Sequence, residues 1–395
     1  MAAAGRMELA ELLRAHGEAY LAAHALSRAQ AKAWRAIVAC RTKALGGHVE
    51  RCGACAAIRH VYHSCRNRHC PKCQTRAKEQ WIAARQRELP PVPYFHLVFT
   101  LPHALNPLAG AHARAVYEAL FESVSRTLTE FGANPRWLGG ALAFTLVLHT
   151  WAQNLMRHLH VHALVAGGAL NAHGSWVSSR RGFLFPVKAL SRVFRGKFIA
   201  AIQAQREQGR FGSQSHFTDA AWCELIGELR RHDWVVYAKQ PLGGPAQVLD
   251  YLARYTHRVA ISNERILGLD RGQVAFRVRA GPHGKGKRVE HLAAETFIGR
   301  FLQHVLPPGF KRIRHYGLLA NAHKSEQLAA CRVAFQLPEP DAPLIENLDA
   351  FMRRVAQIDI TACPHCRIGR WQLIAAITPI RPDWHRRLAT GPPRR

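Results

Sequence analysis

Acidic side chains are scarce in this sequence. Asp and Glu together number 26 against 55 Lys and Arg, which gives the 395-residue chain a formal net charge of +29. The positive charge extends along the chain and is not confined to one tail. This excess predicts a polyanionic partner, and nucleic acid is the first candidate because each neutralised phosphate releases counterions. An acidic membrane surface is the alternative, and it requires a basic amphipathic helix or a hydrophobic anchor.

Long hydrophobic runs are missing as well. No apolar stretch approaches the ~20 residues that a membrane-spanning helix needs, which argues against a membrane partner. The segment Met1–Glu8 lacks the apolar core of a secretory signal, so we expect a cytoplasmic protein. Apolar residues still make up 48% of the chain, which at this length allows a sizeable core and more than one domain.

The ten cysteines are distributed unevenly. Two Cys-x2-Cys pairs, Cys52/Cys55 and Cys70/Cys73, have the spacing of a structural zinc site. In a chain without a secretory signal, such clustering indicates metal binding rather than disulfides. We predict that these four cysteines surround one tetrahedral zinc ion, which supplies folding energy to a short segment.

Cys65 lies between the two pairs, and its role is open. It replaces one of the four ligands, stays a buried thiol, or joins His48, His63 or His69 in a second site. Basic residues surround the pairs and predict contact with DNA, a solvated basic face being the alternative. The basic residues that we single out are Arg66, Arg68 and Lys72.

Another Cys-x2-Cys pair, Cys363/Cys366, lies near the C-terminal end. It supplies only two of the four ligands that a structural zinc ion requires. Cys331, His323, His365 or another chain are the candidates for completing it.

Histidines alternate in the segment Arg157–Gly168. His158, His160 and His162 occupy every second position, so on a β-strand their side chains would project from one face. Imidazoles gathered in this way favour a divalent metal site. The alternative is a histidine-bearing strand edge that binds nothing.

Two tyrosines follow a Gly-Gly-Pro loop, inside a segment with helical periodicity. Tyr251 and Tyr255 are four residues apart and would share one helix face. Core packing with polar tips is the ordinary explanation for such a pair. The neighbouring Arg254, His257 and Arg258 favour a second explanation, because they could hold a phosphate beside the tyrosine hydroxyls.

Apolar periodicity elsewhere predicts an α+β fold. Helical patterns cover residues 1–45, 110–131, 188–209 and 295–306. Strand-like patterns cover 94–103, 141–149, 157–168, 234–238, 273–279 and 288–292. We expect an N-terminal helical segment at 1–45, a zinc-binding DNA-contact domain at 46–80, a catalytic domain at 90–320, and a C-terminal helical and basic region at 321–395.

These groups together suggest one reaction. A tyrosine hydroxyl can attack a phosphodiester and form a covalent phosphotyrosine with release of a 3′ hydroxyl. A divalent ion held by the histidines would polarise the scissile phosphate. Two tyrosines on one face would permit two sequential strand transfers without ATP, because the covalent link keeps the energy of the phosphodiester.

Several longer motifs carry a resemblance to a known family, over roughly Ala39 to Arg332. They are Ser64–Gln74, Phe99–His103, His149–Asn154, His158–His162, Asp233–Lys239, Tyr251–Asn263 and Arg314–Asn321. In these motifs the chain resembles the two-tyrosine transposases of rolling-circle insertion sequences. Those enzymes belong to the HUH single-strand endonuclease superfamily, and this group carries an N-terminal zinc-binding domain.

The resemblance implies an antiparallel sheet with helices on it, plus a small zinc domain and helical terminal segments. It assigns the His-hydrophobe-His pair to His160 and His162, and the catalytic tyrosines to Tyr251 and Tyr255. The third ligand stays open between His158, His149 and the side-chain carbonyl of Gln153. Leu159 departs from the family, where proline is usual, which puts the pose of His158 in question.

The resemblance also implies the partners and cofactors. It predicts structural Zn²⁺, a catalytic Mg²⁺ or Mn²⁺, and single-stranded DNA at element ends and target, in a nucleoid-associated prokaryotic protein. The product would be a 5′-phosphotyrosine intermediate. The alternatives are a rolling-circle replication initiator of a plasmid or phage, and a zinc-finger DNA-binding protein without catalytic activity.

Overall fold

The chain forms two compact units, which we describe separately. The computed structural model describes residues 7–86, 88–212, 217–242, 247, 260–281, 286–339 and 346–380. The first unit comprises Met1–Ala77, Ile261–Gly299 and Asp341–Arg395. The second unit comprises Lys78–Ala260 and Arg300–Pro340. Within the described residues, every helix is too short or too polar to cross a lipid bilayer.

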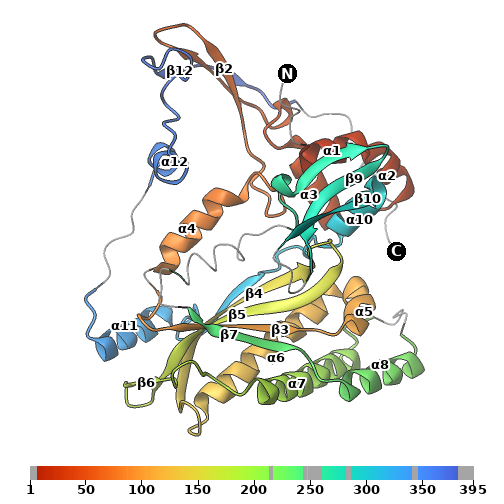
Figure 1. Cartoon of the computed structure of the whole chain (residues 1–395), viewed down its shortest axis with the longest axis vertical. Helices are drawn as coiled ribbons and strands as arrows, with labels where there is room; N and C mark the ends of the chain where they lie inside the picture. Colours follow the sequence, from red (N-terminus) through yellow and green to blue (C-terminus); the bar gives the residue numbers. More distant parts are fainter. Residues whose placement is uncertain are drawn as a thin grey trace. The chain divides into compact units, whose positions relative to one another are not determined.

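An antiparallel sheet forms the centre of the second unit (Figure 1). Its strands are β3 (Tyr94–Thr100), β4 (Gly140–Trp151), β5 (Arg157–Asn171), β6 (Trp176–Ser178), β7 (Val236–Leu242) and β11 (Ile313–Gly317). They lie in the order β11-β4-β5-β3-β7, and β6 pairs with β5 off this path. β5 is therefore an interior strand, and the predicted α+β fold with an antiparallel sheet is confirmed.

Helices cover one face of this sheet (Figure 1). They are α5 (Asn106–Ala111), α6 (Ala113–Ala133), α7 (Val187–Glu207) and α8 (Asp219–Arg231). α6 presents Val116, Leu120, Val124 and Leu128 at four-residue spacing, and all four are fully buried. They join one apolar core with the strand residues of this face, including Val161 of β5. This spacing places a continuous stripe of apolar side chains on one side of the helix, which explains the packing.

The opposite face of the sheet has a smaller apolar cluster. Tyr94, Ala143 and Leu164 pack there against Leu318 and against Leu328 of α11 (Lys324–Phe335). α4 (Gln74–Gln86) contributes Trp81 at the edge of this cluster. The cluster therefore fixes the end of the face that lies away from His160.

Helices from the N-terminal region and strands from much later in the chain form part of the first unit. The elements are α1 (Leu9–Ala15), α2 (Gly17–Ala23), α3 (Arg28–Ala39), β8 (Ile266–Asp270), β9 (Gln273–Arg279), β10 (Lys287–Ala293) and α10 (Ala294–Leu302). The Leu9 backbone N–H donates to Asn263 Oδ1 at 3.2 Å, and His24 lies 2.7 Å from Glu295. Residues 261–299 thus belong with the N-terminal helices, whereas the sequence placed them in a catalytic domain at 90–320. Contacts between residues far apart in the sequence cause this difference. Local periodicity predicts helices and strands but not which distant segments pack together.

A narrow sheet with the order β12-β1-β2 completes the first unit. Its strands are β1 (Gly47–Cys52), β2 (Ile58–Tyr62) and β12 (Trp371–Ile377), and α12 (Leu348–Ala356) precedes β12. β1 is the central strand, so a segment from the C-terminal region pairs with the N-terminal hairpin. The sequence patterns did not predict β12.

Candidate active site and metal centres

Register between β4 and β5 brings the central histidines together. His149 on β4 is paired directly with His160 on β5, and His162 follows two residues later on the same face. The intervening Val161 points to the opposite face and is fully buried in the helix-covered core. The triad of His149, His160 and His162 is therefore supported from behind by packed apolar side chains. Each can place a ring nitrogen within 4.8 Å of the others.

The hydrogen bonds of the triad orient its ring nitrogens. His160 Nδ1 lies 3.0 Å from the backbone carbonyl oxygen of His158, so this nitrogen carries the proton and donates. His160 Nε2 then keeps its lone pair for a ligand. His162 Nε2 lies 3.1 Å from His149 Nδ1. Two nitrogens about 2.1 Å from one ion at a right angle would be about 3.0 Å apart, so the observed separation fits a shared divalent ion.

His96 on β3 is a residue that the sequence reasoning missed. Its Nε2 lies 2.8 Å from His162 Nδ1, and the two rings stack with centroids 5.0 Å apart. If His162 Nδ1–H donates to His96, His162 Nε2 faces the triad as a ligand. The available signal was a single polar residue inside an otherwise apolar strand, Tyr94–Thr100.

Burial keeps these imidazoles neutral. It lowers the pKa of His160 to about 4 and that of His96 to about 3. The rings of both are therefore uncharged near neutral pH, as a metal ligand and a hydrogen-bond acceptor must be. At these two positions the site therefore offers uncharged imidazole nitrogens and carries no positive charge that would repel a metal ion.

The turn between β4 and β5 is held from outside the sheet. Leu155 adopts a left-handed backbone conformation with φ of 63°. Its carbonyl accepts hydrogen bonds from Gln303 Nε2 at 2.7 Å and from His304 Nε2 at 2.9 Å. His304 Nδ1 in turn lies 3.1 Å from Thr150 Oγ1. These contacts fix the turn that links His149 to β5, and no pattern in the sequence predicts them.

The other predicted ligands, His158 and Gln153, fall outside the group of ring nitrogens that lie within 4.8 Å of one another, although the His158 ring neighbours that of His160 with centroids 4.9 Å apart. His158 Nδ1 is 3.3 Å from His103 Nε2, and the two rings meet edge to face. Gln153 lies half-buried in the turn between the two strands. β5 begins at Arg157 and runs through the buried Leu159, so the absence of proline leaves His158 within the strand.

The predicted tyrosines and their neighbours lie outside the described residues. These are Tyr251, Arg254, Tyr255, His257 and Arg258. Their assignment to the reaction stays a prediction from sequence.

The cysteines form two clusters. Cys40, Cys65, Cys70 and Cys73 make up one, with Sγ–Sγ distances of 3.4 Å for Cys40–Cys73 and 3.7 Å for Cys65–Cys73. Ligands on a tetrahedron with Zn–S bonds of about 2.3 Å would be about 3.8 Å apart, so this cluster fits zinc. Cys40 is the C-cap residue that follows α3, and it was not predicted as a ligand because a lone cysteine has no spacing to reveal it.

The structure corrects the prediction that Cys52/Cys55 and Cys70/Cys73 share one ion. β1 extends from Gly47 to Cys52, which is about 17 Å of strand at 3.3 Å per residue. The pair Cys52/Cys55 therefore lies at the tip of the hairpin and the other cluster lies beyond its base. Cys52 and Cys55 instead meet Cys363 and Cys366.

The two clusters also decide among the roles that the sequence left open for Cys65 and among the partners that it left open for Cys363 and Cys366. Cys65 belongs to the first cluster. It replaces one of the four predicted ligands, as one of the alternatives stated. Cys331 is buried among apolar residues of the second unit and belongs to neither of the two cysteine clusters.

The three basic residues predicted to contact DNA, Arg66, Arg68 and Lys72, differ in exposure and in ion pairing. Arg66 and Arg68 are exposed. Lys72 forms an ion pair with Glu8, which partly neutralises its charge. The structure thus leaves Arg66 and Arg68 as the more accessible of the three predicted contacts.

Comparison with known proteins gives the family. A family model described as a putative transposase matches residues 143–327, and one described as a transposase zinc-binding domain matches residues 12–101. The putative transposase y4qJ of Sinorhizobium fredii (strain NBRC 101917 / NGR234) is 41% identical over 98% of this chain and 97% of its own length. The transposase for insertion sequence element IS801 of Pseudomonas savastanoi pv. phaseolicola is 27% identical over 77% of this chain and 73% of its own length.

Solved structures give a more distant likeness. The conjugative relaxase TrwC in complex with oriT DNA, in a metal-bound structure, is 15% identical, covering 63% of this chain and 74% of that chain, with a TM-score of 0.23. A metal-free structure of the same complex covers 62% of this chain and 73% of that chain at 15% identity, with a TM-score of 0.24.

The chain belongs to the rolling-circle transposases of the IS91 type, which carry an N-terminal zinc-binding domain. It is accordingly a transposase. No comparison favours the alternatives of a replication initiator or a non-catalytic zinc-finger protein.

Proposed function

We propose that this transposase cuts and rejoins single-stranded DNA at element ends with a divalent ion held by His149, His160 and His162. The ion, when bound, would polarise the scissile phosphate and stabilise negative charge on its oxygens. Tyr251 or Tyr255 would supply the nucleophile. As its phenolic oxygen bonds to phosphorus and gives up its proton, the bond from phosphorus to the 3′ oxygen breaks. The strand end then leaves as a 3′ hydroxyl, and a 5′-phosphotyrosine remains.

The geometry of the triad is the observation that carries this proposal. Three histidines on paired strands turn ring nitrogens toward one another, and the proton of His160 Nδ1 is tied to a backbone carbonyl. Hydrogen bonds of this kind orient metal-binding histidines in proteins and set which nitrogen binds. His149 is favoured over His158 as the third ligand, because the ring nitrogens of His149, His160 and His162 lie within 4.8 Å of one another, whereas His158 Nδ1 faces His103 Nε2 at 3.3 Å.

The three imidazole ligands are better suited to Mn²⁺ than to Mg²⁺. Imidazole suits transition metals, whereas Mg²⁺ prefers oxygen ligands and water. We therefore expect Mn²⁺ to support cleavage at lower concentration than Mg²⁺, and the comparison of the two titrations tests this choice.

The zinc-binding domain would use Cys40, Cys65, Cys70 and Cys73 for one structural ion. Cys40→Ser should release this zinc and expose the region to protease. Cys223→Ser is a matched control, because Cys223 is exposed on α8 and lies in neither cysteine cluster.

Cleavage of a labelled single-stranded oligonucleotide carrying an element end tests the catalytic proposal. His149→Ala should lower the rate by more than about 100-fold, since even residues that only orient a metal ligand cost 10–100-fold. His158→Ala is the matched control from the same strand face, and it should stay close to wild type. The double substitution Tyr251→Phe plus Tyr255→Phe should abolish the covalent protein–DNA product. Equal activity of that double variant and the wild type would overturn the role of the tyrosines.

A further inference from the structure

The cysteines at the tip of the hairpin meet a pair from the other end of the chain. Cys52 Sγ lies 3.7 Å from Cys366 Sγ, and Cys55 Sγ lies 3.8 Å from Cys363 Sγ. All four sulfurs lie within 4.8 Å of one another. A disulfide requires about 2.05 Å, whereas four thiolates around zinc are separated by about 3.8 Å. The distances therefore match a tetrahedral metal site.

Backbone amides support the sulfurs on both sides. The Ala54 N–H donates to Cys52 Sγ at 3.4 Å, and the Gly369 N–H donates to Cys366 Sγ at 3.3 Å. Such bonds stabilise the negative charge of a thiolate, which is the form that binds metal. At Gly369 a Cβ atom would lie 2.3 Å from Cys52 Sγ, so only glycine allows this close approach.

The segment around the C-terminal pair is fastened to the hairpin in other ways as well. β12 pairs with β1 from Gly47↔Ile377 to Cys52↔Trp371. Arg59 of β2 donates to the Ile360 carbonyl at 2.8 Å, and its guanidinium lies 4.3 Å from the centroid of the Trp371 ring. These contacts bring the Cys363/Cys366 turn to the tip of the hairpin.

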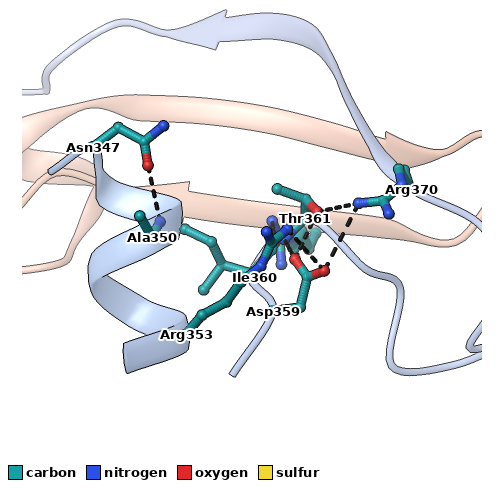
Figure 2. Close-up of polar contacts among 8 residues, drawn as sticks. Asn347, Ala350, Arg353, Asp359, Ile360, Thr361 and Arg370 are labelled. Atoms are coloured by element: carbon teal, nitrogen blue, oxygen red, sulfur yellow. Dashed lines mark hydrogen bonds and ion pairs between the residues drawn. The ribbon is translucent and has the colours of Figure 1, made fainter. Parts of the chain in front are cut away.

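Asp359 arranges the approach to this turn (Figure 2). Its carboxylate accepts hydrogen bonds from the Thr361 hydroxyl at 2.6 Å, the Thr361 N–H at 2.9 Å and Arg353 at 3.1 Å. Arg370 donates to Thr361 Oγ1 at 2.6 Å from the far side of the turn. Asn347 caps the preceding helix through the Ala350 N–H, as Figure 2 shows. Polar contacts thus join Thr361, before the Cys363/Cys366 turn, to Arg370, after it.

Apolar burial is too slight to hold this sheet. Leu373 is 70% exposed, Ile374 is 46% exposed, and Ile58 on β2 is 58% exposed. Small sheets without a buried apolar face need a metal, a disulfide or a larger partner for stability. Cys52, Cys55, Cys363 and Cys366 are all free cysteines, so a metal ion bound by their four sulfurs could supply that stability.

We propose that Cys52, Cys55, Cys363 and Cys366 bind a second zinc ion that joins the C-terminal segment to the N-terminal hairpin. The zinc-binding domain is then a composite of both ends of the chain. Its second site lies partly beyond residues 12–101, where the zinc-binding domain is matched. This proposal stands on the cysteine geometry alone and does not depend on the catalytic proposal.

Zinc content of the purified full-length protein tests it. Wild type should hold two zinc ions per chain, and Cys363→Ser should hold one. Cys40→Ser should also hold one, and the variant that combines both substitutions should hold none. Cys223→Ser, the matched control, should keep both. A wild-type content of one ion, or an unchanged content in Cys363→Ser, would overturn the proposal.

Thiol labelling of the wild type keeps the proposal testable if the serine variants fail to fold. In the native full chain, Cys363 and Cys366 should resist alkylation together with Cys52 and Cys55, and a chelator should expose all four. Cys223 should be labelled from the start. Rapid labelling of Cys363 before chelation, as read by peptide mass spectrometry, would contradict the composite site.

Discussion

The histidine triad and the tip of the hairpin both gather metal-binding side chains, but on different kinds of support. The triad lies on interior strands whose opposite face packs against helices, and Val161 behind it is fully buried. At the tip of the hairpin, the neighbouring apolar residues Leu373 and Ile374 remain largely exposed. In the second unit the packed core therefore positions the metal ligands. In the hairpin the metal ligands would instead stabilise the fold. A metal should act on chemistry in the first case and on stability in the second.

Removal of all metal should separate the two regions most strongly. Structural zinc contributes on the order of 10 kcal/mol in small domains, more than the exposed sheet of β1, β2 and β12 can replace. We expect a strong chelator to abolish hydrogen-exchange protection in these strands while β3, β4 and β5 keep theirs. Hydrogen exchange read by mass spectrometry checks both regions in one sample. Parallel loss in both regions would contradict the contrast.

Substitutions of apolar residues should sharpen the same contrast. Leu120 of α6 is fully buried in the core behind the triad, and Leu120→Ala should lower the free energy of unfolding by about 3 kcal/mol. The matched Leu373→Ala in β12 should change it by less than about 0.5 kcal/mol, because little apolar area is buried there. Denaturant unfolding of the zinc-loaded protein measures both. A larger cost at Leu373 than at Leu120 would reverse our account.

A smaller effect is expected at His96, which contacts the triad without joining it. His96→Phe keeps most of the ring volume but removes the acceptor for His162 Nδ1. We expect a loss of metal affinity of about 10–100-fold, typical of a residue that orients a ligand. His96→Gln should recover part of the affinity, since its side-chain oxygen can accept the same proton. Equal affinities in the two variants would assign His96 to packing alone.

The sequence pointed to two members of the histidine triad, His160 and His162, before the structure was known. Alternation of His158, His160 and His162 fixed which side chains share a face, because side-chain direction on a strand has a period of two. The choice between His149 and His158 depended instead on strand register and on the neighbour His103. No local pattern specifies either, so the sequence left the third position open.

The cysteines show where spacing misleads. Two Cys-x2-Cys pairs close in sequence suggested one ion, but the strand between Gly47 and Cys52 moves one pair about 17 Å from the base of the hairpin. Cys40 and the pair Cys363/Cys366 complete the two clusters from other parts of the chain. Partners this distant in sequence are brought together by β12 and by the end of α3, which only the folded chain reveals.

Binding of Mn²⁺ to the zinc-loaded full-length protein tests the central claim most directly. Electron paramagnetic resonance would follow the titration in wild type, His149→Ala and His158→Ala. We predict one bound Mn²⁺ in wild type and in His158→Ala, and its loss in His149→Ala with the zinc content unchanged. Undiminished Mn²⁺ binding in His149→Ala would contradict the claim that the paired strands β4 and β5 build the catalytic metal site.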